Sequence, residues 1–185
     1  MKKLAILLMT VFALLSCTEK SQTKNTPDHV FSGLNKSPMD VAWFPKDYKV
    51  LDKSIKIVYS RPQLGKREIE MLAPAGKVWR TGANEAAEIT FFKDVTFGGE
   101  KVKAGTYAFF TIPGDTEWTL ILNSARNAWG DYTYKESEDV VRVKGTVSNG
   151  ETYIDAFSIA FVGEEGNVIM HLGWANTIVT VPIKY

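Results

Sequence analysis

The stretch "TYAFFTIPGDTEWTLILN", residues 106–123, is the strongest indication of the fold. Two runs rich in β-branched and aromatic residues flank Pro113-Gly114-Asp115, a combination typical of strands separated by a turn. In the second run, residues 117–123, apolar side chains occupy both faces, as in a strand that is covered on both sides. The stretch therefore predicts two strands, the second of them central in its sheet.

Short apolar or alternating runs bounded by turn residues continue on both sides of this stretch. They lie at 55–60, 87–92, 95–97, 140–147, 153–161, 168–174 and 177–183, and Gly98-Gly99 is a hairpin signal. The one helical candidate is "GKREIEML", residues 65–72. We therefore expect a single all-β domain, an antiparallel β-sandwich with at most one or two short helices, or alternatively a partly closed β-barrel.

The N-terminus carries the pattern of a bacterial export signal. Two lysines follow Met1, residues 4–15 are apolar, and Leu14-Leu15-Ser16 precedes Cys17. This ending resembles the bacterial lipobox, in which a small residue precedes a cysteine that becomes lipidated and, after cleavage, is the new N-terminus. We expect a signal peptide over residues 1–16 and a lipid on Cys17. The alternative is an ordinary signal peptide that ends at a chance cysteine.

Residues 17–36 are polar, with few apolar positions, and are interpreted as a flexible tether that leaves 37–185 as the domain. No acidic cluster of the kind that directs some lipoproteins to the outer surface follows Cys17. We therefore expect attachment to the outer membrane, facing the periplasm. Cys17 is the only cysteine, so the domain has no disulfide, thiolate nucleophile or cysteine-bound metal.

The charge balance and the missing motifs exclude several functions. Twenty-two Lys+Arg against 21 Asp+Glu provide no net field that would attract nucleic acid. The sequence has no phosphate-binding loop, dinucleotide fingerprint or His-Glu-x-x-His motif, and no metal or cofactor is expected. His171 would be the default general base of a hydrolase, but a hydrogen-bonded imidazole on a half-covered sheet face is the simpler interpretation.

Arg61 continues the apolar face of the 55–60 run, and Pro62 ends that strand. A guanidinium directed toward a core requires a carboxylate partner or a bound anion. Asp155 shares a face with Tyr153 and Phe157 in the same way. We therefore consider an Arg61–Asp155 ion pair.

The stretch "GKVWRTGANEAAEITFF", residues 76–92, contains the candidate site. The Thr81-Gly82-Ala83-Asn84 segment predicts a tight reversal before a strand, with Glu85 close to Arg80. One hypothesis joins Arg67, Trp79, Arg80, Asn84 and Glu85 in a polar cleft with an aromatic wall, of the kind that stacks sugars or other planar groups. The alternative is an Arg80–Glu85 ion pair that only closes a turn.

The chain from about Ser37 onward resembles the bacterial family named domain of unknown function 2911. The resemblance rests on residues 59–62, 65–69, 76–86, 104–107, 112–113, Trp118, Asn123, 129–134 and 174–177. Two departures are visible: Ser37-Pro38-Met39 replaces the family's Ser-Pro-Arg, and Glu70-Met71 stands where the family often has glycine. The resemblance implies an exported or lipid-anchored protein of Bacteroidetes or neighbouring groups, and no reaction.

Three functions are compatible with these observations. The first is a lipid-anchored envelope protein that binds a small polar or anionic ligand, or another envelope component. Its site would contain Arg61, Arg67, Trp79, Arg80, Asn84, Glu85, Trp129 and Tyr132, with no catalytic residue. The second is a hydrolase that uses Glu85 beside Arg80. The third is a purely structural part of an envelope assembly, which would expose an apolar patch.

Overall fold

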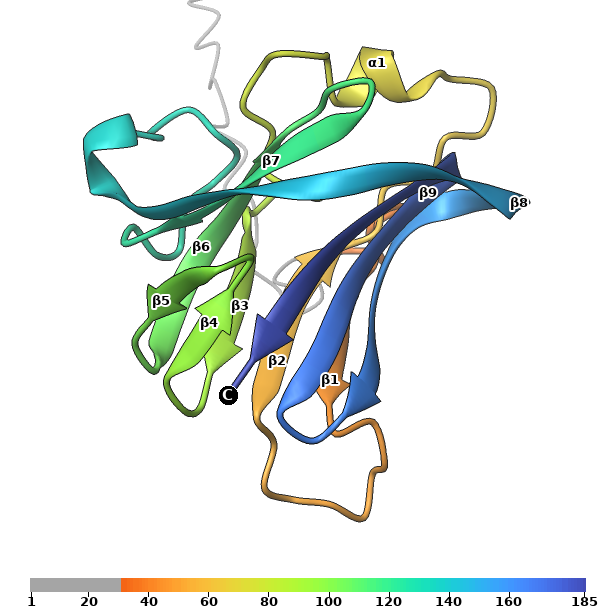
Figure 1. Cartoon of the computed structure of the whole chain (residues 1–185). Helices are drawn as coiled ribbons and strands as arrows, with labels where there is room; N and C mark the ends of the chain where they lie inside the picture. The colour runs from red at the N-terminus through yellow and green to blue at the C-terminus, as the bar shows by residue number, and fades with distance from the viewer. Residues whose placement is uncertain (1–30) are drawn as a thin grey trace, which may run out of the picture. The chain divides into compact units, whose positions relative to one another are not determined.

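The computed structural model describes residues 31–185, which form one antiparallel sheet of nine strands folded over a common core (Figure 1). The strands are β1 Met39–Phe44, β2 Ile55–Ser60, β3 Ala87–Phe91, β4 Val95–Phe97, β5 Glu100–Val102, β6 Gly105–Ile112, β7 Glu117–Asn123, β8 Asp139–Glu164 and β9 Asn167–Lys184. Their order is β1-β2-β3-β6-β7-β8-β9-β4-β5. Within the described residues, helix is limited to α1 Ile69–Leu72 and the 3-10 turn Glu136–Glu138. The predicted all-β sandwich is confirmed.

Strands β6 and β7 occupy the centre of the sheet, as the opening stretch predicts. They pair from Ala108 opposite Asn123 to Ile112 opposite Thr119. Phe109 and the even-numbered apolar residues of β7 face the main core, whereas Phe110 and Ile121 face the opposite side. Both faces are buried, because a second, smaller apolar cluster covers the side that turns away from the main core.

Strands β8 and β9 differ from the prediction. The four runs expected between 140 and 183 form only two strands, of 26 and 18 residues. Register shifts in β8 between Asn149 and Ile154, and between Ile154 and Ser158, bend the strand where a reversal was expected. β8 therefore leaves its pairing with β7 and crosses to form a long hairpin with β9 (Figure 1).

Strands β1 and β5 were not predicted from the sequence. They are the two ends of the sheet. An edge strand pairs on one side only, so it needs less of the alternating apolar pattern that identifies a strand in sequence. Three residues suffice for β5, and β1 leaves Met39, Val41 and Trp43 exposed.

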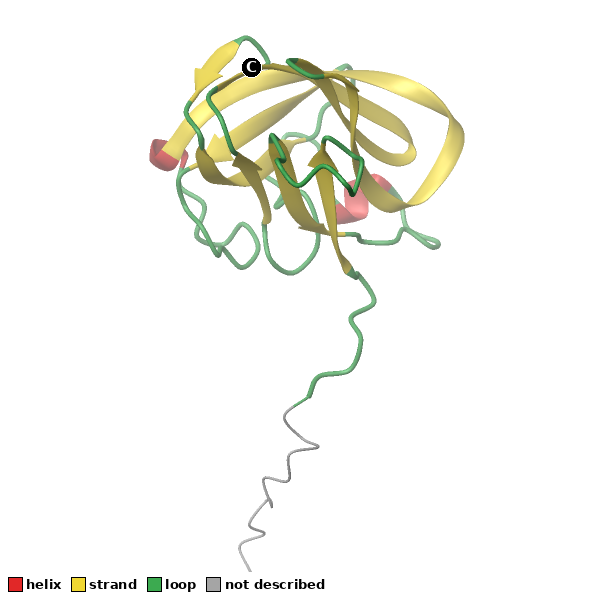
Figure 2. Cartoon of the chain, turned by 90° about the horizontal axis from the view of Figure 1, so that it is seen from below, coloured by secondary structure: helices red, strands yellow, loops and turns green. Residues whose placement is uncertain are grey.

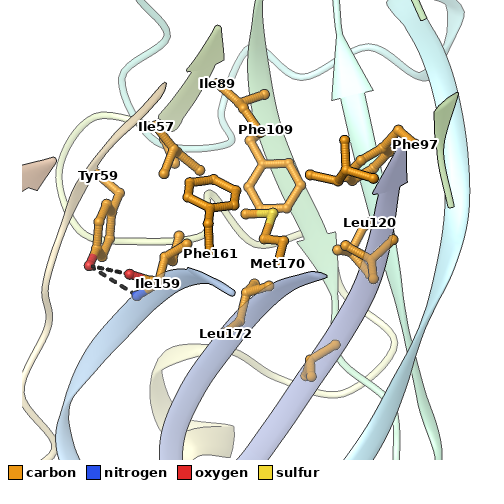
Figure 3. Packing of buried hydrophobic residues seen from close by; sticks show 14 of the residues in the cluster. Ile57, Tyr59, Ile89, Phe97, Phe109, Leu120, Ile159, Phe161, Met170 and Leu172 are labelled. Carbon is orange, nitrogen blue, oxygen red and sulfur yellow. Dashed lines mark hydrogen bonds between the residues drawn. The ribbon is translucent and has the colours of Figure 1, made fainter. Parts of the chain in front are cut away.

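The main core lies where the two halves of the folded sheet face each other. Figure 3 shows the facing side chains, which are Ile57, Ile89 and Phe109 from one half and Phe161, Met170 and Leu172 from the other. The Tyr59 hydroxyl accepts a hydrogen bond from the Ile159 N–H at 2.9 Å and donates to the Ile159 carbonyl at 3.4 Å. This one hydroxyl satisfies two backbone groups on the free edge of β8 and ties that edge to β2.

The start of β1 and the C-terminus lie on opposite sides of the domain (Figure 2). Residues 31–36, the end of the predicted tether, are exposed and belong to no helix or strand. The predicted signal peptide, Cys17 and the rest of the tether lie outside the described residues. None of the helices in the described part of the chain is long and apolar enough to cross a membrane.

His171 lies on β9 opposite Ala160 of β8 and is half-buried. Its neighbours Met170 and Leu172 point into the core, so the imidazole lies on the outer face of the hairpin. Partial burial lowers the pKa of His171 below its ordinary value, because desolvation disfavours the charged imidazolium.

Because the lowered pKa of His171 belongs to the folded state, we expect stability to depend on pH. Above the unfolded-state pKa of about 6.5 the imidazole is neutral in both states and adds no pH dependence. As the pH falls below that value, the unfolded chain binds a proton more readily, so the free energy of unfolding decreases. Urea unfolding between pH 7.5 and pH 5.5 should show this decrease, and His171→Gln should reduce its slope. Equal slopes in both proteins would contradict the assignment.

Candidate functional site

The loop between β7 and β8, residues 124–138, covers the outer face of β6 and β7. Ala128 and Tyr134 of this loop pack with Phe110 and Ile121 in the second apolar cluster. The Tyr134 ring meets Phe110 edge to face, with ring centres 5.1 Å apart. The loop is therefore held by apolar burial, as a packed element of the domain.

A polar network around Asp139 fixes the end of this loop. The Asp139 carboxylate accepts hydrogen bonds from the Tyr134 hydroxyl at 2.6 Å and the Asn123 amide at 2.8 Å, and it pairs with the Arg142 Nε at 2.7 Å. Arg142 also contacts Glu136 at 3.0 Å. Burial, followed by the hydrogen bond to Asp139, raises the pKa of Tyr134 to about 12. This network holds the loop in one position on the sheet.

Sequence reasoning missed the roles of Asp139 and Arg142. In an alternating run such as 140–147, a single arginine is normally a solvated side chain. The sequence could have indicated this network through Asn123 and Asp139. These two polar residues flank the loop, and the pairing of β7 with β8 places them opposite each other.

The loop is joined directly to the predicted 76–92 segment. The Ala86 N–H donates to the Ala128 carbonyl at 2.9 Å, and the Gly130 N–H donates to the Asn84 carbonyl at 2.8 Å. Between these bonds, Glu85 and Trp129 form an antiparallel bridge. Directly opposed residues project to the same side, with Cβ atoms about 5 Å apart. Two segments that lie more than 40 residues apart therefore place Glu85 beside Trp129.

The bridge depends on unusual backbone conformations. Asn84 has a φ of +63°, which asparagine tolerates well, and Gly130 has a φ of +69°. A Cβ on Gly130 would lie 2.8 Å from the ring of Tyr132, so the glycine lets that ring pack against the loop backbone. The expected tight reversal at 81–84 is therefore matched by a second turn in the loop.

Two aromatic side chains project from this loop into solvent. Trp129 is 60% exposed and Tyr132 is 79% exposed. Their backbone is held by the bridge, by the second apolar cluster and by the Asp139 network. An aromatic ring on a braced backbone loses little conformational entropy when a ligand stacks on it.

A pocket of about 240 Å³ opens next to Glu85. Its lining includes Met39, Ser60 and Glu88. One oxygen of the Glu88 carboxylate accepts a hydrogen bond from the Asn127 N–H at 2.7 Å. The Glu85 side chain is exposed, and its carboxylate has no hydrogen bond or ion pair within residues 31–185. We use the name Glu85–Trp129 surface for Asn84, Glu85, Trp129, Tyr132 and this pocket.

The structure does not bring Trp79 to this surface. Trp79 is 2% exposed and lies in the main core. Its ring is stacked on Trp174 with centres 5.2 Å apart, and Trp118 and Phe157 meet it edge to face. The aromatic wall predicted for a ligand is therefore part of the packing between the two halves of the domain.

Arg61 and Arg67 are occupied by structural contacts. Arg61 donates to the Phe157 carbonyl at 3.0 Å and the Ser158 hydroxyl at 2.7 Å, and it pairs with Asp40 at 3.1 Å. Arg67 donates to the carbonyls of Leu64 and Gln63. Both guanidiniums donate hydrogen bonds to backbone carbonyls, and neither faces the Glu85–Trp129 surface.

The Arg61–Asp155 ion pair is not formed. Arg61 reaches the neighbouring edge strand instead, and its partner is Asp40 of β1. Asp155 accepts a hydrogen bond from the Gly65 N–H at 2.9 Å, and its backbone carbonyl accepts one from the Trp174 indole. β1 was absent from the predicted strands, which is why its aspartate was not considered.

Arg80 is half-buried, and no ion pair joins it to Glu85 within the described chain. Its Nε atom is buried without a hydrogen-bond partner among those residues. The ion pair of the turn-closing alternative is therefore not formed within residues 31–185. No cluster of three or more His, Cys, Asp or Glu side chains with metal-binding geometry occurs in residues 31–185.

A family model described as "Protein of unknown function (DUF2911)" matches residues 44–183. This chain belongs to that family. The match spans nearly all of the folded domain and includes both segments of the Glu85–Trp129 surface, which are paired through the Glu85–Trp129 bridge. No curated protein and no solved structure matches the chain.

The exposure of Tyr132 predicts that two glycine substitutions have similar effects. Gly130→Ala and Gly65→Ala both place a Cβ on a left-handed residue, at a cost of about 1–2 kcal/mol each. Gly65 has open space around it, and the Tyr132 ring beside Gly130 is the exposed end of a side chain that can turn away. We therefore expect the two substitutions to lower the free energy of unfolding by about the same amount, roughly 1–2 kcal/mol. Urea unfolding measures both, and a clearly larger loss in Gly130→Ala would show that the Tyr132 ring is held against the loop.

Proposed function

We propose that this chain is a non-catalytic, lipid-anchored protein of the bacterial cell envelope whose domain binds a polar sugar-like ligand at the Glu85–Trp129 surface. The observation that carries this proposal is the placement of Trp129 beside Glu85, whose carboxylate has no partner within residues 31–185, with Tyr132 exposed on the same loop. Sugar rings present apolar C–H faces to aromatic side chains and hydroxyl donors to carboxylates and amides. Trp129 and Tyr132 supply the first kind of contact and Glu85 the second.

The charge at this surface favours a neutral ligand over an anionic one. Glu85 and Glu88 both border the pocket. Arg61 and Arg67, which would have attracted an anion, are engaged elsewhere. A neutral polyhydroxylated ligand avoids repulsion from the two carboxylates and can donate hydrogen bonds to Glu85.

The hydrolase hypothesis has less support than binding. It uses Glu85 as an acid or base beside Arg80. Glu85 is exposed beside a pocket, as this role requires, but the other carboxylate at that pocket, Glu88, already accepts a hydrogen bond from the Asn127 N–H. The envelope location rests on the sequence, through the basic start, the apolar segment and the residues before Cys17. The polar residues 17–36 support a tether, and the lack of an acidic cluster after Cys17 supports a position at the periplasm-facing side of the outer membrane.

Sugar binding is tested on the full chain, purified in a non-glycosidic detergent and titrated with soluble oligosaccharides of glucose, N-acetylglucosamine and xylose. Calorimetric titration measures binding, because its signal does not depend on Trp129, the residue that one variant removes. We expect Trp129→Ala to weaken binding about tenfold or more, and Glu85→Gln about tenfold.

Trp43→Ala is the matched control, since Trp43 is 40% exposed, lies on β1 and lines a different pocket. It should leave sugar affinity unchanged. Failure of all three sugar series to bind would contradict the proposal. So would an equal loss of affinity in Trp43→Ala and Trp129→Ala.

Lipid anchoring has a separate test, in which the full chain is expressed in a Gram-negative host supplied with labelled palmitate. We expect the unaltered chain to carry the label and Cys17→Ser to lack it, because serine cannot carry the thioether-linked lipid. Ser16→Ala is the control and should keep the label, since it keeps a small residue before the cysteine. Equal labelling of Cys17→Ser and the unaltered chain, or no label in either, would rule out the lipid on Cys17.

A further inference from the structure

A row of polar side chains crosses the three strands β5, β4 and β9 at the end of the sheet. Thr96 of β4 lies opposite Lys101 of β5 on one side and opposite Lys184 of β9 on the other. Val95 and Phe97 are buried in the main core, so Thr96 and its two partners project from the outer face. One hydroxyl is thus flanked by two lysines on adjacent strands.

This row borders a cavity of about 440 Å³. Asp94, Lys103 and Tyr185 complete the part of its lining that carries polar groups. The cavity is separate from the Glu85–Trp129 surface, because no residue lines both pockets.

The charges around this cavity are divided into paired and unpaired groups. Lys103 pairs with the Asp94 carboxylate at 2.7 Å, and the other Asp94 oxygen accepts the Ala104 N–H at 2.9 Å. Asp94 carries the one side-chain carboxylate that lines the cavity, and it is thereby occupied at both oxygens and holds Lys103 in place. The ammonium groups of Lys101 and Lys184 have no hydrogen bond or ion pair within residues 31–185.

The neighbouring cation Lys93 is already engaged. It pairs with Glu165 at 3.2 Å and lies 4.8 Å from the centre of the Tyr185 ring. The positive charge available to a ligand is therefore concentrated on Lys101 and Lys184.

The spacing of these two lysines suits one shared anion. Strands lie about 4.8 Å apart, so the two lysine backbones are about 10 Å apart with Thr96 between them. A lysine side chain is long and flexible enough for both ammonium groups to converge above the threonine hydroxyl. An anion there removes the repulsion between the ammonium groups and accepts charge-assisted hydrogen bonds from both, with the hydroxyl as a third donor.

We propose that this cavity binds a phosphate group, held by Lys101, Lys184 and Thr96, with Lys103 at its rim. A phosphate has enough acceptor oxygens to engage three or more donors at once, which a carboxylate achieves less readily. The phosphate belongs either to a soluble phosphate compound or to the headgroup of an anionic phospholipid. This site is independent of the sugar-like ligand proposed above.

The test uses the full chain carrying Cys17→Ser, so that its own lipid cannot attach it to vesicles. Calorimetric titration with inorganic pyrophosphate tests the soluble source. Flotation with phosphatidylglycerol vesicles, compared with phosphatidylcholine vesicles, tests the lipid source. We expect Lys101→Ala/Lys184→Ala to weaken binding about tenfold or more, and Thr96→Val to weaken it less while leaving the net charge unchanged.

Lys66→Ala/Lys77→Ala is the matched control, because it removes the same charge from two exposed lysines outside the cavity. It should change affinity by less than about twofold. Binding of either probe that is lost only in the cavity variants supports the site, and the probe identifies the source. Binding of neither probe, or equal losses in the two double variants, would overturn it. Circular dichroism verifies that each variant is folded.

Discussion

The burial of β6 and β7 on both faces is the constraint on which the rest of the domain depends. Phe109 faces the main core, and its neighbour Phe110 faces outward. A phenylalanine left on the outer face would expose a large apolar area to water, so the chain needs a second covering layer. The 124–138 loop supplies it through Ala128 and Tyr134. The same packing that completes the core therefore also fixes the position of Trp129.

The basic side chains divide by chemistry into structural and available groups. Arg61, Arg67 and Arg142 have planar guanidiniums with several donors, and each donates to backbone or carboxylate oxygens. Arg61 joins β2 to β8 and β1, whereas Arg67 and Arg142 contact residues close to them in the chain. Lys101 and Lys184 are flexible point charges on the outer face of the sheet and remain unpaired within the described residues. The sequence indicated Arg61 and Arg67 as ligand-binding residues, but their hydrogen bonds show that they stabilise the fold.

The strands that follow from local pattern were predicted well. Those at 55–60, 87–91, 105–112 and 117–123 agree with the structure within a residue or so, because alternation and turn residues act over a few positions. The candidate site was predicted in part. Asn84, Glu85, Trp129 and Tyr132 do come together, whereas Trp79 was mistaken for a ligand-facing aromatic, since burial of a tryptophan depends on which segments pack against it.

The sequence by itself determined the all-β class, the central position of 117–123, the family, and the export pattern before Cys17. Each of these properties depends on residues that are close together in the chain. Tertiary structure decided the partner of Arg61, the union of the 140–147 and 153–161 runs into one bent strand, and the bridge between Glu85 and Trp129. Those outcomes depend on register between distant segments, which is set by the simultaneous packing of the whole core and has no local signature.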